Sequence, residues 1–139
     1  MDLKIVPVNS DNINQCFSFW DFEKDEFKKK KLLYEIKNGQ REMYACIKKD
    51  KYIAGFSIKY INEKQIYLAY LSVNKSFQNQ GIGSCIIDFV SQHAISSGRR
   101  EILLEVDTDN INARRLYERK GFVKIRNESS ARILLIKPL

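Results

Sequence analysis

Apolar side chains recur along this chain with two different spacings, and the spacing separates the helices from the strands. Helical spacing predicts a first helix capped by Ser10 or Asp11, a second over residues 25–38, a third from Ile82 until Gly98, and a fourth over residues 113–120. Runs rich in β-branched and aromatic residues predict strands over residues 3–8, 43–48, 52–60, 66–73, 101–106, 122–126 and 132–136. This order predicts a mixed α/β fold: an antiparallel meander, one right-handed parallel crossover, and a final antiparallel pair.

The same spacing predicts which side chains of the first two helices are buried. The first helix would carry Ile13, Cys16, Phe17 and Trp20, and the second would turn Phe27, Leu32, Leu33 and Ile36 inward. Pro7 suits an edge strand, because proline cannot donate a ladder hydrogen bond.

The loop between the strand at residues 66–73 and the third helix has the sequence Gln78-Asn79-Gln80-Gly81-Ile82-Gly83. Such a turn leaves backbone N–H groups unpaired at the positive end of a helix, where phosphate oxygens bind. Gly81 and Gly83 would remove side chains that block the approach of a phosphate. Glycine spacing alone is a weak indication, because a tight turn at the start of a helix gives the same pattern.

Length and composition are those of a soluble globular protein with one domain. The 139 residues are 44% hydrophobic and 29% charged. No apolar run is long enough to span a bilayer and the first residues begin no signal peptide, so we expect no membrane association. Cys16, Cys46 and Cys85 lack CxxC spacing, which predicts neither disulfides nor a zinc site and fits a reducing cytoplasm. His93, the single histidine, is expected at the surface of the third helix.

The net charge of +7, from 24 basic and 17 acidic residues, points to an anionic partner. Nucleic acid, an acidic protein and a small polyanionic cofactor would each satisfy it. One basic run, residues 28–31, is expected to be a solvated helix face. Because no nucleic-acid-binding signature accompanies the charge, nucleic acid is not the expected partner.

Two segments resemble the motifs of one protein family. Residues 73–84, Val-Asn-Lys-Ser-Phe-Gln-Asn-Gln-Gly-Ile-Gly-Ser, are similar to a Q/R-x-x-G-x-G/A loop. Residues 110–122, Asn-Ile-Asn-Ala-Arg-Arg-Leu-Tyr-Glu-Arg-Lys-Gly-Phe, are similar to an N-x-x-A-x-x-L-Y-x-x-x-G-F segment. Both are motifs of the GNAT acyltransferase superfamily, in the family's order and spacing. The resemblance covers nearly the whole chain and predicts a single GNAT domain over residues 1–139, with a mixed, mostly antiparallel sheet and helices on both faces. It extends to the small branch that acetylates protein N-terminal amines.

The resemblance implies an acetyl-CoA-dependent N-acetyltransferase that needs no metal and in which a primary amine attacks the thioester directly in a ternary complex. Leu71 and Val73 would pair with the pantetheine arm, and a main-chain N–H near Val73 would polarise the thioester carbonyl. Asn110 would contact the amide region of the cofactor. The pyrophosphate would bind the backbone amides of Gln78, Asn79, Gln80, Gly81, Ile82, Gly83 and Ser84.

The resemblance also assigns the chemistry. Tyr117 occupies the Leu-Tyr position of the motif, where a phenol contacts the cofactor and protonates the departing thiolate; core packing is the alternative. Where many members place a basic glutamate, this chain has Tyr67 or Tyr70. Glu105 is therefore the expected general base, with Asp107, an ordered water or a purely structural glutamate as alternatives.

The acceptor stays open at this stage, between a protein N-terminus and a small-molecule amine. Aromatic residues of the first segment either line the acceptor groove or belong to the core: Phe17, Phe19, Trp20, Phe22 and Phe27. The rival function is a non-catalytic module that binds acyl-CoA or accompanies nucleic acid. Formation of a homodimer and the use of acyl groups other than acetyl also stay open.

Overall fold

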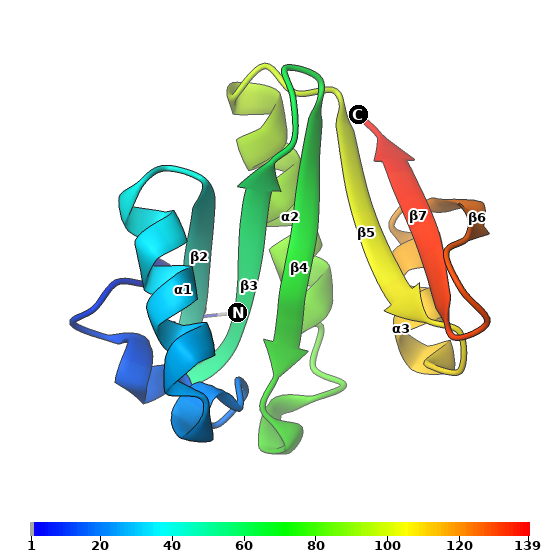
Figure 1. Cartoon of the computed structure of the whole chain (residues 1–139). Helices are drawn as coiled ribbons and strands as arrows, with labels where there is room; N and C mark the ends of the chain where they lie inside the picture. Colours follow the sequence, from blue (N-terminus) through cyan, green and yellow to red (C-terminus); the bar gives the residue numbers. More distant parts are fainter. Residues whose placement is uncertain (1) are drawn as a thin grey trace. The chain divides into compact units, whose positions relative to one another are not determined.

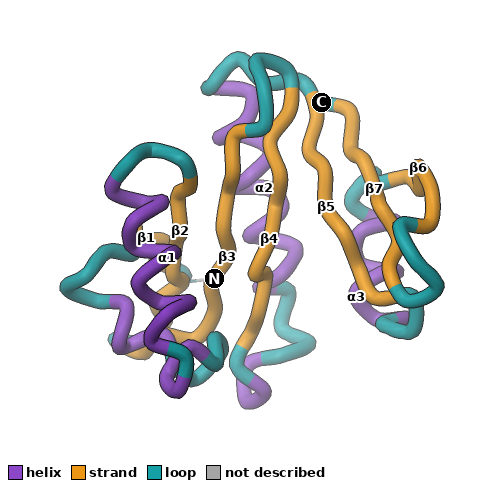
Figure 2. Tube along the Cα trace, in the orientation of Figure 1, coloured by secondary structure: helices purple, strands orange, loops and turns teal. Residues whose placement is uncertain are grey.

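The computed structural model describes residues 2–139, except the side chain of Glu23. Figures 1 and 2 show how strands and helices follow one another along the chain. The strands are β1 (Lys4–Pro7), β2 (Arg41–Lys48), β3 (Lys51–Tyr60), β4 (Gln65–Val73), β5 (Glu101–Asp107), β6 (Val123–Asn127) and β7 (Arg132–Pro138). The α-helices are α1 (Glu26–Lys37), α2 (Ile82–Ser96) and α3 (Ile111–Arg119).

The strands form one mixed, mostly antiparallel sheet with the order β1-β2-β3-β4-β5-β7-β6. β1 pairs antiparallel with β2, and β2 with β3. β4 and β5 are parallel neighbours joined through α2, whereas β7 pairs antiparallel with both β5 and β6. The predicted meander, parallel crossover, final antiparallel pair and edge position of the first strand are confirmed.

The residues form two compact units. The first unit contains the chain through Lys59 together with Tyr70–Ile82, and the second contains Tyr60–Ala69 and Gly83–Leu139. The core of the first unit is built from Val8, Ile13, Cys16, Phe19, Trp20, Phe22, Leu32, Met43 and Ala45. The second unit buries the apolar faces of α2, β5 and β7, among them Ile86, Val90, Ile102, Leu104 and Ile133.

The α-helix predicted after Ser10 is wrong. This segment instead forms two short 3₁₀ turns, Ile13–Cys16 and Phe22–Lys24. Asparagine side chains explain the difference. Asn12 Oδ1 accepts the Asn9 backbone N–H at 2.8 Å, and Asn9 Oδ1 accepts the Asp11 backbone N–H at 2.9 Å. Such local bonds compete with helical ones.

Helix α1 confirms the second predicted helix, and Asp25 Oδ1 caps it by accepting the Lys28 N–H at 2.9 Å. The predicted inward position of Phe27 is wrong, because this side chain is 81% exposed. Phe27 lies five positions before buried Leu32, which is about 140° around the helix. Of the aromatic set, Phe19, Trp20 and Phe22 are buried core residues.

Two further expectations about exposure are wrong in part. Lys30 and Lys31 are exposed, but Lys28 and Lys29 are half-buried, with the Lys28 ammonium 5.2 Å from the centre of the Tyr70 ring. In the second unit, His93 is half-buried rather than at the surface. Its Nε2 lies 2.9 Å from the Tyr60 hydroxyl, and its ring stacks on Phe89. The error for Lys28 and Lys29 has a simple reason. Long lysine side chains bury their stems while the charge stays near water, and a sequence pattern does not distinguish this from full exposure.

Candidate active site

The second unit brings a carboxylate and a phenol together on neighbouring parallel strands. Tyr67 on β4 is in register with Leu103 on β5, and Glu105 lies two positions further along the same face. The Tyr67 hydroxyl donates a hydrogen bond to Glu105 Oε2 at 2.7 Å. Both side chains are half-buried. Burial, followed by the bond to Glu105 and its negative charge, raises the pKa of Tyr67, so this phenol stays protonated and acts as a donor.

A second charged pair lies on the antiparallel neighbours β5 and β7. Asp107 and Arg132 are register partners, and Arg132 Nη1 donates to Asp107 Oδ1 at 2.7 Å. The bond to Asp107 raises the pKa of Arg132 above its already high value. Asp107 therefore accepts a hydrogen bond from an arginine, whereas Glu105 accepts one from a phenol. The positive charge of Arg132 also acts on Glu105 and Tyr67.

Tyr117 lies on α3 and is only 8% exposed. Its ring packs edge-on against Phe122, with ring centres 5.6 Å apart. Burial raises the pKa of Tyr117 to about 12, and the positive charge of Arg132 opposes this rise. No hydrogen bond engages its hydroxyl among residues 2–139, so the donor is available to a ligand. Tyr117 is thus both a core side chain and a phenol with a free O–H, and the two interpretations of the sequence are compatible.

Asn110 is the N-terminal capping residue of α3, a role that the sequence motif did not predict. Its Oδ1 accepts the Ala113 backbone N–H at 3.2 Å and caps α3. The side chain is exposed, so its amide N–H₂ group faces solvent while the oxygen holds the helix. The predicted contact with the cofactor stays a prediction.

The glycine-containing loop has the form expected of a phosphate-binding turn. Gln78, Asn79, Gln80 and Gly81 are exposed and lead directly into α2, which begins at Ile82. Asn79 and Gly81 have φ angles of +62° and +80°, so the backbone turns through the left-handed region just before the helix. Lys48 Nζ donates to Gln80 Oε1 at 3.3 Å, which adds a positive charge beside the loop. Ile82 itself is buried and contributes only backbone to the surface.

Gly83 also lies where two helices come close together. A Cβ at this position would lie 2.9 Å from Leu116 Cδ2 on α3, closer than van der Waals contact permits. The missing side chain therefore lets α2 and α3 approach each other, and its predicted role in making room for a phosphate stays a prediction. Ser84 follows it on α2 and is half-buried.

The end of β4 belongs to the first unit and contains an irregular residue. Tyr70 has φ of +54°, which is rare for a bulky side chain. Its carbonyl accepts the Trp20 Nε1–H at 2.8 Å, and its ring packs against Phe22. Leu71 and Val73, the predicted pantetheine contacts, are half-buried, and the Val73 carbonyl accepts Gln78 Nε2–H at 3.0 Å. Tyr67, not Tyr70, is therefore the tyrosine that meets Glu105.

The sequence-based prediction missed three features of the site. These are the hydrogen bond between Tyr67 and Glu105, the presence of Arg132, and the presence of Lys48. Tyr67 and Glu105 are 38 positions apart, and only the parallel register joins them. Arg132 had a usable signal, because it is a charged residue at the start of an apolar strand. Lys48 had none, since its relation to Gln80 depends on tertiary structure.

Comparison with known proteins identifies the family. The model of the Acetyltransferase (GNAT) family matches residues 11–122, which is most of the chain. The chain belongs to the GNAT acetyltransferase family. The identification rests on the same region that holds the glycine loop, Glu105 and Tyr117.

Individual relatives agree with this assignment. Human N-acetyltransferase 8 is 33% identical over 64 residues, which are 46% of this chain and 28% of that protein. N-alpha-acetyltransferase 30 of Dictyostelium discoideum is 37% identical over 60 residues, 43% of this chain and 32% of that protein. The alignments thus span less than a third of each relative's length.

Solved structures share the fold at low sequence identity. PaiA N-acetyltransferase from Thermoplasma acidophilum, in complex with coenzyme A, matches with a TM-score of 0.86 at 15% identity over 100% of both chains. A GNAT acetyltransferase from Elizabethkingia anophelis with acetyl-CoA bound matches with a TM-score of 0.75 at 16% identity over 99% of both chains. The predicted GNAT fold is confirmed.

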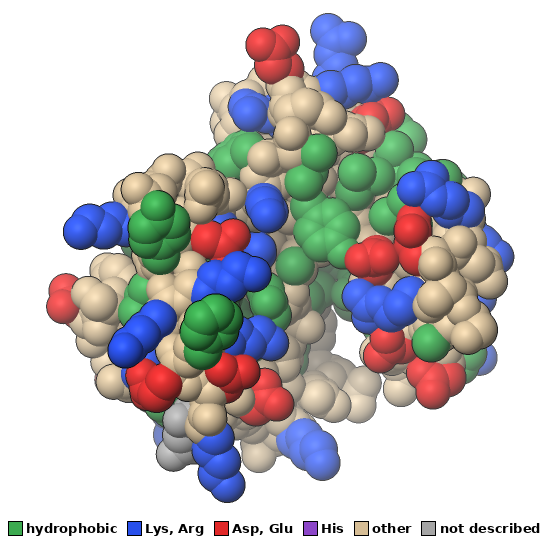
Figure 3. Space-filling view, viewed as in Figure 1, with side chains coloured by type: hydrophobic (Ala, Val, Ile, Leu, Met, Phe, Trp, Pro, Cys, Tyr) green, Lys and Arg blue, Asp and Glu red, His purple; other side chains and the backbone are tan. Residues whose placement is uncertain are grey.

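Two further observations concern nucleic acid and membranes as partners. Basic and acidic side chains are interspersed on the face seen in Figure 3, rather than gathered in one basic patch. None of the helices within residues 2–139 is long and apolar enough to cross a membrane.

Proposed function

We propose that this protein is an acetyl-CoA-dependent N-acetyltransferase in which a primary amine attacks the thioester directly. Membership of the GNAT family supports the reaction class. The observation that carries the proposal is the Tyr67–Glu105 hydrogen bond of 2.7 Å in the unit that also contains Tyr117. One group can accept a proton from the amine, and another can donate a proton to the leaving sulfur.

Glu105 is proposed as the proton acceptor. An amine is mostly protonated at neutral pH and must lose a proton before or as it attacks. The Tyr67 hydroxyl engages only Oε2 of the carboxylate, which leaves Oε1 for the amine or for a bridging water. Tyr67 fixes the orientation of the carboxylate without neutralising it.

Tyr117 is proposed as the donor to the leaving sulfur. As the new C–N bond forms and the C–S bond breaks, negative charge develops on sulfur, and the Tyr117 O–H donates to it. A phenol with a pKa of about 12 is a weaker acid than a thiol with an ordinary pKa near 8.5. The hydrogen bond to sulfur is therefore the first contribution, and the phenol O–H is the proton donor of this proposal.

The residues around the glycine loop fit a coenzyme A pyrophosphate. Exposed backbone at residues 78–81 precedes α2, a helix of 15 residues with a positive N-terminal end. Lys48 beside Gln80 adds a cation for a phosphate oxygen. When bound, acetyl-CoA supplies the activated acetyl group. In this proposal Leu71 and Val73 bind the pantetheine arm, and Asn110 contacts its amide region.

The acceptor is proposed to be a primary amine, either a protein N-terminus or a small molecule. One relative is named for N-alpha acetylation, which favours including N-terminal peptides in any test. A cytoplasmic location is part of the proposal, because the three cysteines lack CxxC spacing. The rival, a non-catalytic acyl-CoA or nucleic-acid module, is disfavoured, because the relatives are named acetyltransferases and the Tyr117 hydroxyl is unengaged.

The test is a screen of acceptor amines with acetyl-CoA, in which the reaction is monitored by the release of free thiol. The panel should contain peptides with free N-termini, amino acids and polyamines. We expect acceptor-dependent thiol release that falls in Glu105→Gln and Tyr117→Phe, while the exposed neighbour variant Asp109→Asn retains it. Tight binding of coenzyme A with no thiol release for any amine would favour the non-catalytic module instead.

A further inference from the structure

A cavity on the side of α3 that faces β6 and β7 is not used by the proposed reaction. It measures about 310 Å³, and every residue that lines it belongs to the second unit. Its apolar walls are Phe122, Val123, Ile133 and Leu135. Its polar groups are Arg114 and Glu118 on α3 and Lys124 on β6.

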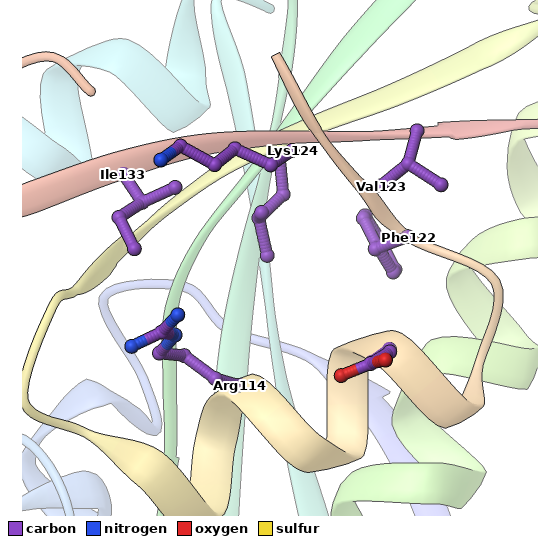
Figure 4. A pocket seen from close by; sticks show the side chains of 7 residues that line it. Arg114, Phe122, Val123, Lys124 and Ile133 are labelled. Atoms are coloured by element: carbon purple, nitrogen blue, oxygen red, sulfur yellow. The ribbon is translucent and has the colours of Figure 1, made fainter. Parts of the chain in front are cut away.

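The cavity is amphipathic. Figure 4 shows Arg114 rising from α3 toward the end where Ile133 lies, whereas Phe122 and Val123 lie at the other end. Phe122 is 3% exposed and Ile133 is 3% exposed, so these walls are firm core side chains. Val123 is 56% exposed and forms part of the rim. Charged and apolar side chains therefore both line the cavity.

The charge in the cavity favours an anion with a single negative charge. Arg114 and Lys124 contribute two positive charges and Glu118 one negative charge, so the net charge is +1. Arg114 Nη1 donates to the Thr108 carbonyl at 2.8 Å, which fixes the guanidinium without neutralising it. No ion pair engages Lys124 or Arg114 in the described part of the chain. A carboxylate would complete the positive end, and Glu118 would oppose a second negative charge.

Cavity size limits the apolar part of the ligand. A volume of about 310 Å³ corresponds to roughly ten water molecules, at the lower end of the range for ligand sites. A medium-chain carboxylate with about ten non-hydrogen atoms would fill it, with its chain against Phe122 and Leu135.

We propose that this cavity, which we name the α3–β7 cavity, binds a small amphipathic monocarboxylate, with the carboxylate on Arg114 and Lys124 and the apolar chain on Phe122, Val123 and Leu135. None of its lining residues belongs to the glycine loop or to the Tyr67–Glu105 pair, and the proposal does not depend on the proposed acetyl transfer. Phe122 connects it to the reaction only through packing, because this ring also contacts Tyr117.

The test is an NMR titration of the full chain with octanoate, with octan-1-ol as the uncharged probe of equal chain length. We expect one saturable site with a Kd below about 1 mM, shifts centred on residues 122–124 and 133–135, and weaker binding of the alcohol. Removing one charge-assisted bond at a partly solvated site should weaken octanoate about tenfold in Lys124→Met. Val123→Trp should abolish binding by filling the cavity from its exposed rim.

Lys31→Met removes the same charge from an exposed position on α1 and should leave octanoate binding unchanged. Coenzyme A should not displace octanoate, since displacement would locate the probe in the cofactor site. The proposal is overturned by absent binding, by displacement with coenzyme A, by equal affinity for the alcohol, or by unaltered affinity in both Lys124→Met and Val123→Trp.

Discussion

Tyr117→Phe is the variant that tests the proposed chemistry most directly. The substitution removes one oxygen and leaves the ring in its place against Phe122. Because no hydrogen bond engages that oxygen within residues 2–139, the free energy of unfolding should change by less than about 1 kcal/mol. Coenzyme A affinity should also change little.

Turnover should respond much more strongly. A positioned proton donor contributes about 10²–10⁴ in rate, which corresponds to about 3–5 kcal/mol of transition-state stabilisation. The loss should be equal in kcat and kcat/KM, because the interaction exists only as sulfur becomes negative. With the pKa of Tyr117 at about 12, the wild-type rate should show no loss from ionisation of this phenol between pH 7 and 10.

The assay is single-turnover acetyl transfer by rapid quench, because product release can mask the chemical step in steady state. The equilibrium Kd for coenzyme A is the control for binding, and the midpoint of urea unfolding is the control for folding. A Phe variant that binds coenzyme A and transfers acetyl at the wild-type single-turnover rate would show that water protonates the sulfur. Tyr117 would then be a packing residue alone.

The other predictions concern the base, the helix contact, the loop and alkaline stability. Glu105→Gln should lower kcat/KM most at low pH, where the amine is protonated; a pH profile parallel to wild type would contradict the base assignment. Gly83→Val should cost about 1–3 kcal/mol in urea unfolding through its clash with Leu116; adding Leu116→Ala should recover part of it, and simple additivity would refute the contact. Lys48→Met should raise the Kd for coenzyme A several-fold and reduce its salt dependence; equal salt slopes would exclude the charge. Because burial raises the pKa of Tyr117 to about 12, ionisation of this buried phenol should destabilise the fold as the pH rises from 10 to 12, by about 3 kcal/mol in all; Tyr117→Phe should lack this part of the alkaline loss, and an identical loss in both proteins would contradict it.

Much of the fold was predictable because apolar spacing is a local property. The runs at residues 66–73 and 101–106 became β4 and β5 with boundaries shifted by one residue. The segment after Ser10 was not predictable from spacing, because Asn9 and Asn12 hydrogen-bond locally and replace an α-helix by 3₁₀ turns. The spacing of apolar residues carries no information about side-chain hydrogen bonds that compete with the backbone hydrogen bonds of a helix.

The candidate site was predictable only where a motif fixed it. Tyr117 was proposed from its place in a family motif and the glycine loop from its glycines, and their roles stay predictions, whereas the Tyr67–Glu105 pair needed the register of β4 on β5. Gly83 shows a different limit. Its contact with Leu116 could not be predicted, because Leu116 lies 33 positions away on α3, and its predicted role at a phosphate stays a prediction.

Trp20 is a natural fluorescent probe of the backbone at Tyr70. Trp20 is the only tryptophan in the chain, and its indole N–H is bound to the Tyr70 carbonyl at 2.8 Å in a 3%-exposed environment. The emission of a buried indole depends on solvent access and on its hydrogen-bond partner. The fluorescence of unmodified protein should therefore report the conformation of β4 at Tyr70, next to Leu71 and Val73. The proposed binding of coenzyme A at that strand can then be tested in real time without a label.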